Sequence, residues 1–509
     1  MRLSPSQIEA AFHQGLDAVV SLLDGVQDEN AHLHERITRL QDQNRQLQLY
    51  VAALEKRLED LERRLNQNSS NSSRPPSSDW VRRLPPPKKP SGKPKGGQPG
   101  HEGHTLEMVA FPDVVVEHAP AHCAACGLSM SQVGASAAVA RQVFDLPPVA
   151  LEVTEHRALE KRCPFCGCVT WGTFPSEVPA LVQYGPRLKA LVLYLNTYQL
   201  LPFERLSQAI FDLTGQSLST GTLSEIVRQG ADRLTGCCAE IRQQVETSPV
   251  VHADETGLYI NGELFWLHVA STMDETFYAV TKQRGKAGMD AVGVLAKVTG
   301  TMVHDGLSAY QHYEGCTHAL CNAHHLRELR ALEEAGIPWA KRMTRLLLEM
   351  KEVVDAARAA GLGQPAPEVV APFVARYGRL IDRAWKEVGP PPREMVRRPM
   401  KDGSVLIQWR EVRKKSKSYN LLLRLDERRD QVLRFLTEAW VPFDNNQAER
   451  DLRMAKLKQK ISGSFRSEAG AAAFCRLRSY VSTMRKQGKA VLAVLQAAIE
   501  GQPLSCAPC

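Results

Sequence analysis

The sequence predicts a multidomain α+β protein. Leucines recur every seven residues near the N-terminus, and two Cys-x-x-Cys motifs follow them. Near residue 249, helical periodicity gives way to short runs of β-branched and aromatic residues. A chain of 509 residues is long enough for about three to five domains. In chain order we therefore expect a coiled coil, a cysteine-knuckle domain, a helix-turn-helix and an α/β core interrupted by a mostly helical insertion.

The composition is typical of a soluble protein, with 43% hydrophobic and 24% charged residues. No apolar run approaches the roughly 20 residues that a membrane span needs, so we expect no membrane partner. The N-terminus carries Glu9, His13 and Asp17 where a signal peptide would be apolar. These features predict a cytoplasmic protein, in which twelve cysteines favour thiols and metal binding over disulfides.

A heptad repeat over residues 30–66 follows an N-terminal helical segment at residues 1–29. Leucines occupy the d positions and mostly branched residues the a positions: Leu33, Leu40, Leu47, Leu54 and Leu61 at d, with Ile37, Asn44, Val51 and Leu58 at a. A single Asn at an a position fixes the register of two-stranded coiled coils, so we expect a homodimer. The alternative is a lone amphipathic surface helix, although a strict seven-residue repeat favours a supercoil.

Residues 67–104 form a basic linker. Pro, Ser and Gly dominate this segment and cannot bury enough apolar surface to offset the cost of ordering the backbone. Seven Lys or Arg residues lie between Asn66 and Gly100 against one acid, Asp79. We expect a flexible tether whose cations are suited to non-specific phosphate contacts.

Residues 105–180 contain Cys123 and Cys126, then Cys163 and Cys166, each pair followed directly by Gly. A Cys-x-x-Cys turn places two thiolates on one side of a tight loop, and two such knuckles complete a tetrahedral Zn²⁺ site. The run at residues 151–161 between the knuckles predicts a strand. The alternatives are a redox pair or a ligand exchange with Cys168. A closed four-thiolate site would stabilise the fold without catalysing a reaction.

Residues 181–245 predict a helix-turn-helix. One helix is expected to start near Pro186, a second to end at Gly215, and a third to start at Ser219 or Thr220. In a helix-turn-helix the last helix would lie in the major groove of DNA. A plain helical connector is an equally good interpretation of the spacing.

Residues 246–321 form the first part of the core. Short strands are expected at residues 249–255, 256–260, 262–272, 275–281 and 300–306, in an antiparallel meander with one further strand. Asp254 and Asp305 each fall at the carboxyl end of an expected strand. Two close carboxylates repel each other, and a divalent ion such as Mg²⁺ relieves the repulsion because it prefers oxygen ligands.

The third acid is expected from residues 441–490, where Asp444 or Asn445 can cap a helix that carries Glu449. One face of this helix has the order of a carboxylate followed by cations suited to phosphates: Glu449, Arg453, Lys456 and Lys460. The alternative is an ordinary Glu–Arg pair on a solvated face. Residues 491–509 are expected to form a C-terminal tail, of which the last five residues, SCAPC with Cys506 and Cys509, are frayed.

We expect the insertion at residues 322–440 to be mostly helical. At its start, Cys321, His324 and His325 are either metal ligands or residues that support a strand-to-helix junction or contact phosphate, and we favour the second reading beside a carboxylate site. Arg327 is expected to reach a phosphate. The basic run at residues 410–418, with Lys414 and Lys415, is a solvated loop or a further contact to the DNA backbone.

Several motifs in this order resemble those of the insertion-sequence-66 (IS66) family of bacterial transposases. They are the coiled coil, NSSNSSRPPSSD, KGGQPGHEGH, the cysteine knuckles, HADET, HDGLSAY, CNAHHLREL and FDNNQAERDLR. The resemblance covers nearly the whole chain. It implies a DDE-type catalytic core on an RNase H-like fold, with Asp254, Asp305 and Glu449 as the triad that holds Mg²⁺ or Mn²⁺.

The resemblance also implies a reaction and partners. Water would cleave a phosphodiester at the end of an insertion sequence, and the freed 3′-hydroxyl would attack target DNA. The terminal repeats and the target would both be DNA partners of a nucleoid-associated enzyme, and accessory proteins of the same element are a further implied partner. Three alternatives remain: a zinc-containing DNA-binding regulator, a stand-alone nuclease and an inactive copy of a transposase.

Overall fold

A computed structural model describes residues 4–65, 106–391, 393–399, 405–411 and 415–506. The chain divides into two units. The first contains residues 1–82 and 327–336, and the second contains residues 83–326 and 337–509. The predicted linker at residues 67–104, Lys414 and Cys509 lie outside the described residues. No helix in the described part is both long and apolar enough to cross a membrane.

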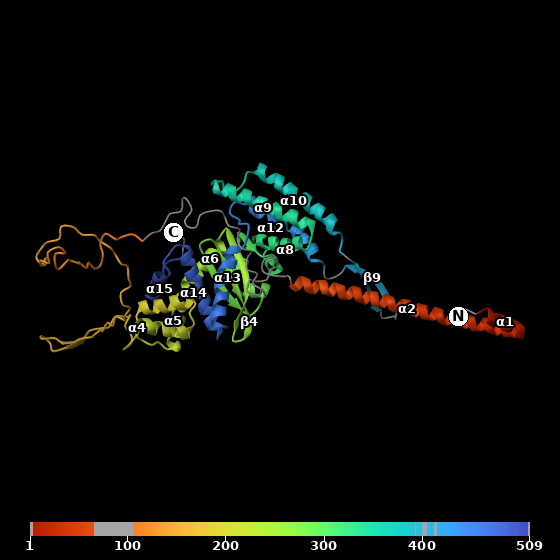
Figure 1. The fold of residues 1–509 in the computed structure, drawn as a ribbon. Coiled ribbons are helices and arrows are strands. Elements are labelled where there is room, and N and C mark those ends of the chain that lie inside the picture. The colour runs from red at the N-terminus through yellow and green to blue at the C-terminus, as the bar shows by residue number, and fades with distance from the viewer. Residues whose placement is uncertain (1–3, 66–105, 392, 400–404, 412–414, 507–509) are drawn as a thin grey trace. The chain divides into compact units, whose positions relative to one another are not determined.

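The N-terminal segment folds into two helices, α1 (Pro5–Gln14) and α2 (Leu16–Leu65) (Figure 1). Gly15 separates them with a φ of 103°, a conformation that glycine adopts without steric cost. The described a and d leucines, isoleucine and valine of the heptad repeat are all exposed on α2. A long helix with an uncovered apolar stripe is what a coiled coil needs from each partner, and dimerisation through it stays a prediction.

The cysteine-knuckle segment contains little regular structure. Its strands β1 (Glu160–Arg162) and β2 (Val169–Trp171) form a hairpin around the second Cys-x-x-Cys motif. A single bridge between His122 and Ser129 brackets the first motif. The strand predicted at residues 151–161 is present only from Glu160.

Four α-helices follow: α3 (Pro186–Leu193), α4 (Phe203–Thr214), α5 (Thr220–Arg233) and α6 (Thr235–Thr247), with a π-helical turn, η2 (Tyr194–Tyr198), after α3. The three predicted boundaries are confirmed. Pro186 opens α3, and Gly215 ends α4 in the left-handed conformation. Ser219 Oγ accepts a hydrogen bond from the backbone N–H of Thr222 and caps α5.

These helices do not have a core of their own. Their buried residues share one hydrophobic cluster with β-strands of the sheet and with two C-terminal helices, α14 (Glu468–Lys486) and α15 (Val491–Ile499). Val491, Val494 and Leu495 of α15 are all buried in this cluster. Residues 491–499 of the expected C-terminal tail are therefore a packed helix, because an apolar nine-residue helix gains more from burial than from solvent exposure. The fraying expected at Cys506 is wrong, because Cys506 is fully buried.

A five-stranded mixed sheet forms the centre of the second unit, with strand order β5-β4-β3-β6-β7. Its strands are β3 (Val250–Ile260), β4 (Glu263–Ser271), β5 (Thr276–Thr281), β6 (Thr301–His304) and β7 (Thr317–Leu320). Strands β3, β4 and β5 form an antiparallel meander, whereas β6 runs parallel to β3 and β7 parallel to β6.

Strand β3 differs from its prediction. The sequence predicted one short strand ending near Asp254 and another beginning at Thr256. In the structure, β3 is continuous through both residues. Its antiparallel ladder with β4 runs from His252 to Ile260, and a two-residue turn at Asn261 and Gly262 with positive φ closes the hairpin. Pairing with β4 thus keeps the chain extended beyond the carboxylate.

The segment between the sheet and the C-terminal helices is mostly helical, as predicted. It contains α8 (Asn322–Glu334), α9 (Pro338–Ala359), α10 (Pro367–Val388), α11 (Lys417–Glu427) and α12 (Arg429–Thr437). The sequence analysis missed an antiparallel hairpin within it, β8 (Arg393–Pro399) and β9 (Val405–Glu411). A further helix, α13 (Asn446–Ser462), packs on β3 and β4, while α14 packs on β5 (Figure 1).

Gly300 lies where the chain enters β6, against the residues that lead into β3. A Cβ at position 300 would lie 2.4 Å from the carbonyl oxygen of Ser248 and 2.5 Å from that of Pro249. We therefore expect Gly300→Ala to lower the free energy of unfolding by about 2–4 kcal/mol, since backbone atoms must move to relieve the overlap. Chemical denaturation measures this change.

Gly315→Ala is the matched control, because a Cβ there would meet nothing within 4 Å. Equal stability of the two variants would contradict the close approach of the β3 and β6 entries.

Candidate active site

Asp254 and Asp305 lie at the same edge of the parallel part of the sheet. The parallel register of β3 and β6 ends with His252 opposite Val303. Two residues further along each chain are Asp254, still within β3, and Asp305, directly after β6. Continuing the register therefore places the two carboxylates opposite each other.

Local hydrogen bonds orient both carboxylates. Asp254 Oδ1 accepts the backbone N–H of Glu255 at 2.8 Å, and Asp305 Oδ1 accepts that of Leu307 at 2.9 Å. Gly306 turns the chain between Asp305 and Leu307 with a φ of 93°. From the helical insertion, Arg428 Nη1 donates to the carbonyl oxygen of Gly306 at 3.3 Å. The insertion thus helps to hold the loop that carries Asp305.

Glu255, the second acid of the HADET motif, has a different role. Successive strand residues point to opposite faces of a sheet, so Glu255 and Asp254 diverge. Arg284 Nε donates to Glu255 Oε1 at 2.8 Å, and His268 Nδ1 lies 3.6 Å from Oε2. Glu255 is therefore a structural partner of Arg284 and His268 on the other face of the sheet.

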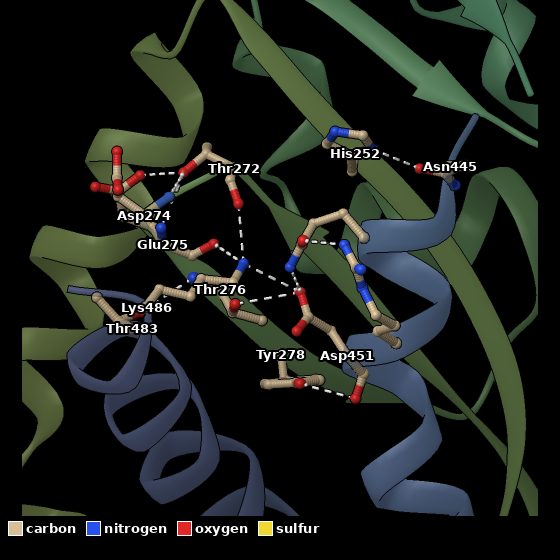
Figure 2. Close-up of polar contacts among 12 residues, drawn as sticks. His252, Thr272, Asp274, Glu275, Thr276, Tyr278, Asn445, Asp451, Thr483 and Lys486 are labelled. Atoms are coloured by element: carbon tan, nitrogen blue, oxygen red, sulfur yellow. Dashed lines mark hydrogen bonds and ion pairs between the residues drawn. The ribbon is translucent and has the colours of Figure 1, made fainter. Parts of the chain in front are cut away.

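Asn445 fastens the start of α13 to the two sheet elements beside the aspartates (Figure 2). Its Nδ2 donates to the carbonyl oxygen of Ala253 at 2.9 Å, so its Oδ1 accepts from His252 Nδ1–H at 2.8 Å. Its backbone N–H donates to Cys321 Sγ at 3.1 Å, where β7 leads into α8. Asn445 is 1% exposed. Of the two predicted caps, Asn445 is the N-cap residue, but its amide makes these long-range contacts instead, whereas Asp444 Oδ1 accepts the backbone N–H of Asn446 at 3.0 Å.

A half-buried ion pair holds the next part of α13 (Figure 2). Lys486 Nζ of α14 lies 3.2 Å from Asp451 Oδ2 and also donates to the carbonyl oxygens of Thr272 and Glu275, each at 2.9 Å. Tyr278 Oη of β5 donates to the carbonyl oxygen of Asp451 at 2.9 Å. Every polar group of this cluster therefore gains a partner, as a buried charge requires.

Lys456 forms a third contact between α13 and the sheet, through Nζ and the carbonyl oxygen of Gly257 at 2.7 Å. Burial lowers the pKa of Lys456. Its ammonium group therefore joins α13 to β3, and only Arg453 and Lys460 of the predicted cationic face are exposed. Glu449 lies along the helix between the contacts of Asn445 and Lys456, so the position of its backbone is fixed from both sides.

The two other predicted acids act electrostatically on Asp254. Burial raises the pKa of Asp254 to about 8, and repulsion from Asp305 and Glu449 adds to the rise. Coulomb repulsion weakens with distance, so both acids lie in the neighbourhood of Asp254 although they are remote in sequence. A set of three carboxylates that repel one another fits a hard divalent cation, which Asp254, Asp305 and Glu449 would hold.

Glu449 also approaches the CNAHHLREL motif. His324 Nδ1 lies 3.7 Å from Glu449 Oε1, and Cys321 joins these two residues in a group whose ligand atoms lie within 4.8 Å of one another. Burial raises the pKa of Cys321 to about 12. His325 is directed elsewhere, with its Nδ1 3.1 Å from Asn322 Oδ1. Of the three candidate ligands in this motif, the structure thus brings together two.

Each cysteine knuckle has the same local geometry. The N–H of Gly127 donates to the carbonyl oxygen of Cys123, and that of Gly167 to that of Cys163, both at 2.9 Å. Hydrogen bonds from the backbone N–H groups two and three residues on lower the pKa of Cys123 and of Cys163, which favours thiolates. This donor arrangement fits Zn²⁺. The two knuckles remain apart, because the one group of three or more candidate ligands in the described residues is that of Glu449.

The remaining predicted DNA contacts are dispersed. Lys415 lies with Nζ 4.6 Å from the ring centroid of Tyr419, and Arg327 is half-buried in α8. On α5, the expected recognition helix, Arg228 pairs with Glu225 at 2.5 Å and Asp232 at 2.9 Å. These acids neutralise the arginine on the exposed face of α5, so that face is not the basic surface typical of phosphate contact.

Comparison with known families identifies the class of protein. Residues 182–473 match the transposase IS66 family, and residues 120–167 match the zinc-finger binding domain of transposase IS66. Residues 26–107 match a family of unknown function. No curated protein matched the chain. The matches define a transposase, and therefore a protein that acts on DNA.

More particularly, the chain belongs to the IS66 family, whose model covers more than half of its length. This confirms the resemblance predicted from the sequence motifs. The zinc-finger match spans all four knuckle cysteines, which supports zinc binding there.

His252 and Asp451 were not among the predicted site residues, and the side-chain role of Asn445 was predicted wrongly. HADET and FDNNQAERDLR do contain all three residues, but no local rule connects residues that are 193 positions apart. The signal available in the sequence was a polar residue within four positions of an expected acid.

Asn445→Ala should lower the free energy of unfolding by about 2–4 kcal/mol, because His252 and the carbonyl oxygen of Ala253 lose their buried partner. Asn446→Ala is the control, since Asn446 is exposed beside it. Thermal and chemical denaturation measure both. Similar stabilities for the two variants would show that Asn445 does not fasten α13.

Asp254→Asn should stabilise the metal-free protein at pH 7.5 by on the order of 1–3 kcal/mol. The pKa of Asp254 is about 8 when folded, against 3.8 as its ordinary value. Ionisation therefore opposes folding, and the free energy of unfolding declines as the pH rises from about 4 to about 8. The variant should lack this decline.

Calorimetry with a chelator and then with Mg²⁺ tests the same carboxylate. Mg²⁺ should raise the Tm of the unsubstituted chain and not that of Asp254→Asn. An equal increase in both would place the Mg²⁺ elsewhere.

Proposed function

We propose that this chain is an active DDE-type transposase that cleaves the ends of an insertion sequence and joins the freed 3′-hydroxyl to target DNA. The observation that carries the proposal is the parallel register that brings Asp254 and Asp305 to one edge of the sheet, with the helix of Glu449 attached to the same strand through Asn445. Acids from β3, the β6 loop and α13 have no structural reason to share one site, since their mutual repulsion costs free energy. Metal-dependent phosphoryl chemistry supplies a reason.

Asp254, Asp305 and Glu449 would hold Mg²⁺ or Mn²⁺ in this reaction. When bound, such ions polarise the scissile phosphate and make water or a hydroxyl group a better nucleophile. The protein contributes rigid placement of its carboxylates, because β3, β6 and α13 are regular elements with buried attachments. The fixed contacts of Asn445, Asp451 and Lys456 keep Glu449 in range of the aspartates.

The same proposal gives roles to other parts of the chain. The mixed sheet would be an RNase H-like core. The zinc finger would recognise the terminal repeats, together with faces of α3 to α5 other than the acid-paired face around Arg228. Arg453 and Lys460, which are exposed on the helix of Glu449, would contact phosphates next to the reacting bond, and Arg327, Lys414 and Lys415 would add further contacts. The exposed stripe of α2 would pair two copies, so that two DNA ends are processed together. Accessory proteins would complete the assembly on the nucleoid.

A zinc-containing DNA-binding regulator, a stand-alone nuclease or an inactive transposase copy would each share part of these features. The regulator or inactive copy would bind DNA without cutting it, and the nuclease would cut without joining. The coupled acids favour the active enzyme, because a regulator gains nothing from carboxylates that repel one another.

The test is a cleavage and joining assay on a terminal-repeat duplex with Mg²⁺. Asp254→Ala, Asp305→Ala and Glu449→Ala should each reduce both steps by at least about 100-fold while DNA binding persists. Asp274→Asn, in the exposed turn between β4 and β5, is the control and should keep full activity. Joining by any of the three alanine variants at the unsubstituted rate would refute the proposed triad.

A further inference from the structure

A second, chemically different group of ligands adjoins the proposed magnesium site. Cys321 directly precedes α8, and His324 follows three residues later on the first turn, where its backbone N–H donates to the carbonyl oxygen of Cys321 at 3.2 Å. Glu449 approaches from α13, with its Oε1 3.7 Å from His324 Nδ1. The sulfur, nitrogen and oxygen atoms lie within 4.8 Å of one another.

The chemistry of this group selects a metal other than Mg²⁺. Mg²⁺ takes oxygen ligands almost exclusively, whereas Zn²⁺ binds thiolate, imidazole and carboxylate together. Three protein ligands leave one tetrahedral position open for water. The combination of Cys, His and Glu therefore suits Zn²⁺, or Co²⁺ as its spectroscopic substitute, and would bind Mg²⁺ poorly.

The surroundings are prepared for a metal-bound thiolate. The backbone N–H of Asn445 points at Cys321 Sγ from 3.1 Å, and a donor to sulfur stabilises its negative charge. Cys321 is 1% exposed, which excludes competing water from the sulfur. The side chains of His324 and Glu449 retain 17% and 26% exposure, so an ion can enter from their side.

Other pairs of thiol and imidazole in the described core lack a third ligand. Cys316 Sγ lies 3.9 Å from His318 Nε2, but no carboxylate completes a group with them in the residues that the structure describes. Cys316 therefore offers a control: a buried cysteine on the same segment of chain, outside the ligand group.

Glu449 belongs to both sites, and this sharing has a consequence. A carboxylate drawn into a zinc site at Cys321 and His324 is no longer free to complete the magnesium site with Asp254 and Asp305. We propose that Cys321, His324 and Glu449 bind Zn²⁺, and that zinc bound there inhibits DNA cleavage by withdrawing Glu449. The inhibitory part rests on the proposed function, whereas the binding part does not.

Metal binding is tested first, on the full chain with its cysteine knuckles loaded with Zn²⁺ and excess metal removed. Added Co²⁺ will not displace Zn²⁺ from the knuckles, because such sites bind Zn²⁺ more tightly. One equivalent of Co²⁺ should give the absorption band of a cobalt–thiolate bond. Cys321→Ser should abolish the band and His324→Gln should weaken Co²⁺ binding at least about tenfold, while Cys316→Ser should leave both unchanged. His324→Gln keeps the core thiol in place, so it tests the site even where Cys321→Ser impairs folding.

Inhibition is tested by adding Zn²⁺ to the cleavage assay at fixed Mg²⁺, with each variant compared with its own zinc-free rate. The zinc concentration that halves the rate should rise at least about tenfold in Cys321→Ser and His324→Gln, and stay unchanged in Cys316→Ser.

The two readouts separate the possible failures. A cobalt band in a chain that cleaves no DNA would support the metal site and refute the proposed function. The proposal is overturned if the band is absent, if it is the same in Cys321→Ser, or if cobalt binds and zinc inhibits all variants equally.

Discussion

The docking of α13 onto the sheet is the constraint on which the rest of the site depends. Asn445 joins this helix to β3 through His252 and Ala253 and to the β7–α8 junction through Cys321. All three contacts connect positions more than a hundred residues apart and lie in the interior, where an unmatched polar group costs about 1–3 kcal/mol. The helix therefore has one favourable position on the sheet. This position fixes the backbone of Glu449, one turn beyond Asn445, and the proposed triad depends on it.

The acids of the candidate site lower the free energy of unfolding of the metal-free protein. Burial and neighbouring carboxylates raise the pKa of Asp254, which weakens the metal-free protein, and the surrounding contacts offset this loss. Lys486 neutralises Asp451 and Arg284 neutralises Glu255, so the acids with structural roles have cationic partners. The uncompensated repulsion is concentrated on Asp254. That contrast between matched and unmatched acids separates a functional carboxylate from a structural one in the same motif.

Local patterns predicted the features that local physics controls. Gly215 and Ser219 end and begin helices because of their own backbone and side-chain properties, and the strand runs that bring Asp254 and Asp305 together follow from β-branched residues. Three features depended on partners elsewhere in the chain. Strand β3 continues past Asp254 because β4 pairs with it, Asn445 is diverted from capping by His252, and Val491–Ile499 is a helix because a core receives it. These partners lie elsewhere in the chain, so a rule based on local residue spacing could not predict their effects.

The most direct measurement of the central claim is cleavage of the polypeptide by a bound metal. Fe²⁺ in place of Mg²⁺, with ascorbate and peroxide, generates hydroxyl radicals that cut the backbone close to the ion. If the three acids surround one metal site, the full chain should be cut near residues 254, 305 and 449 together, and excess Mg²⁺ should suppress all three cuts in parallel. Cuts near residues 254 and 305 without one near residue 449 would contradict the shared site.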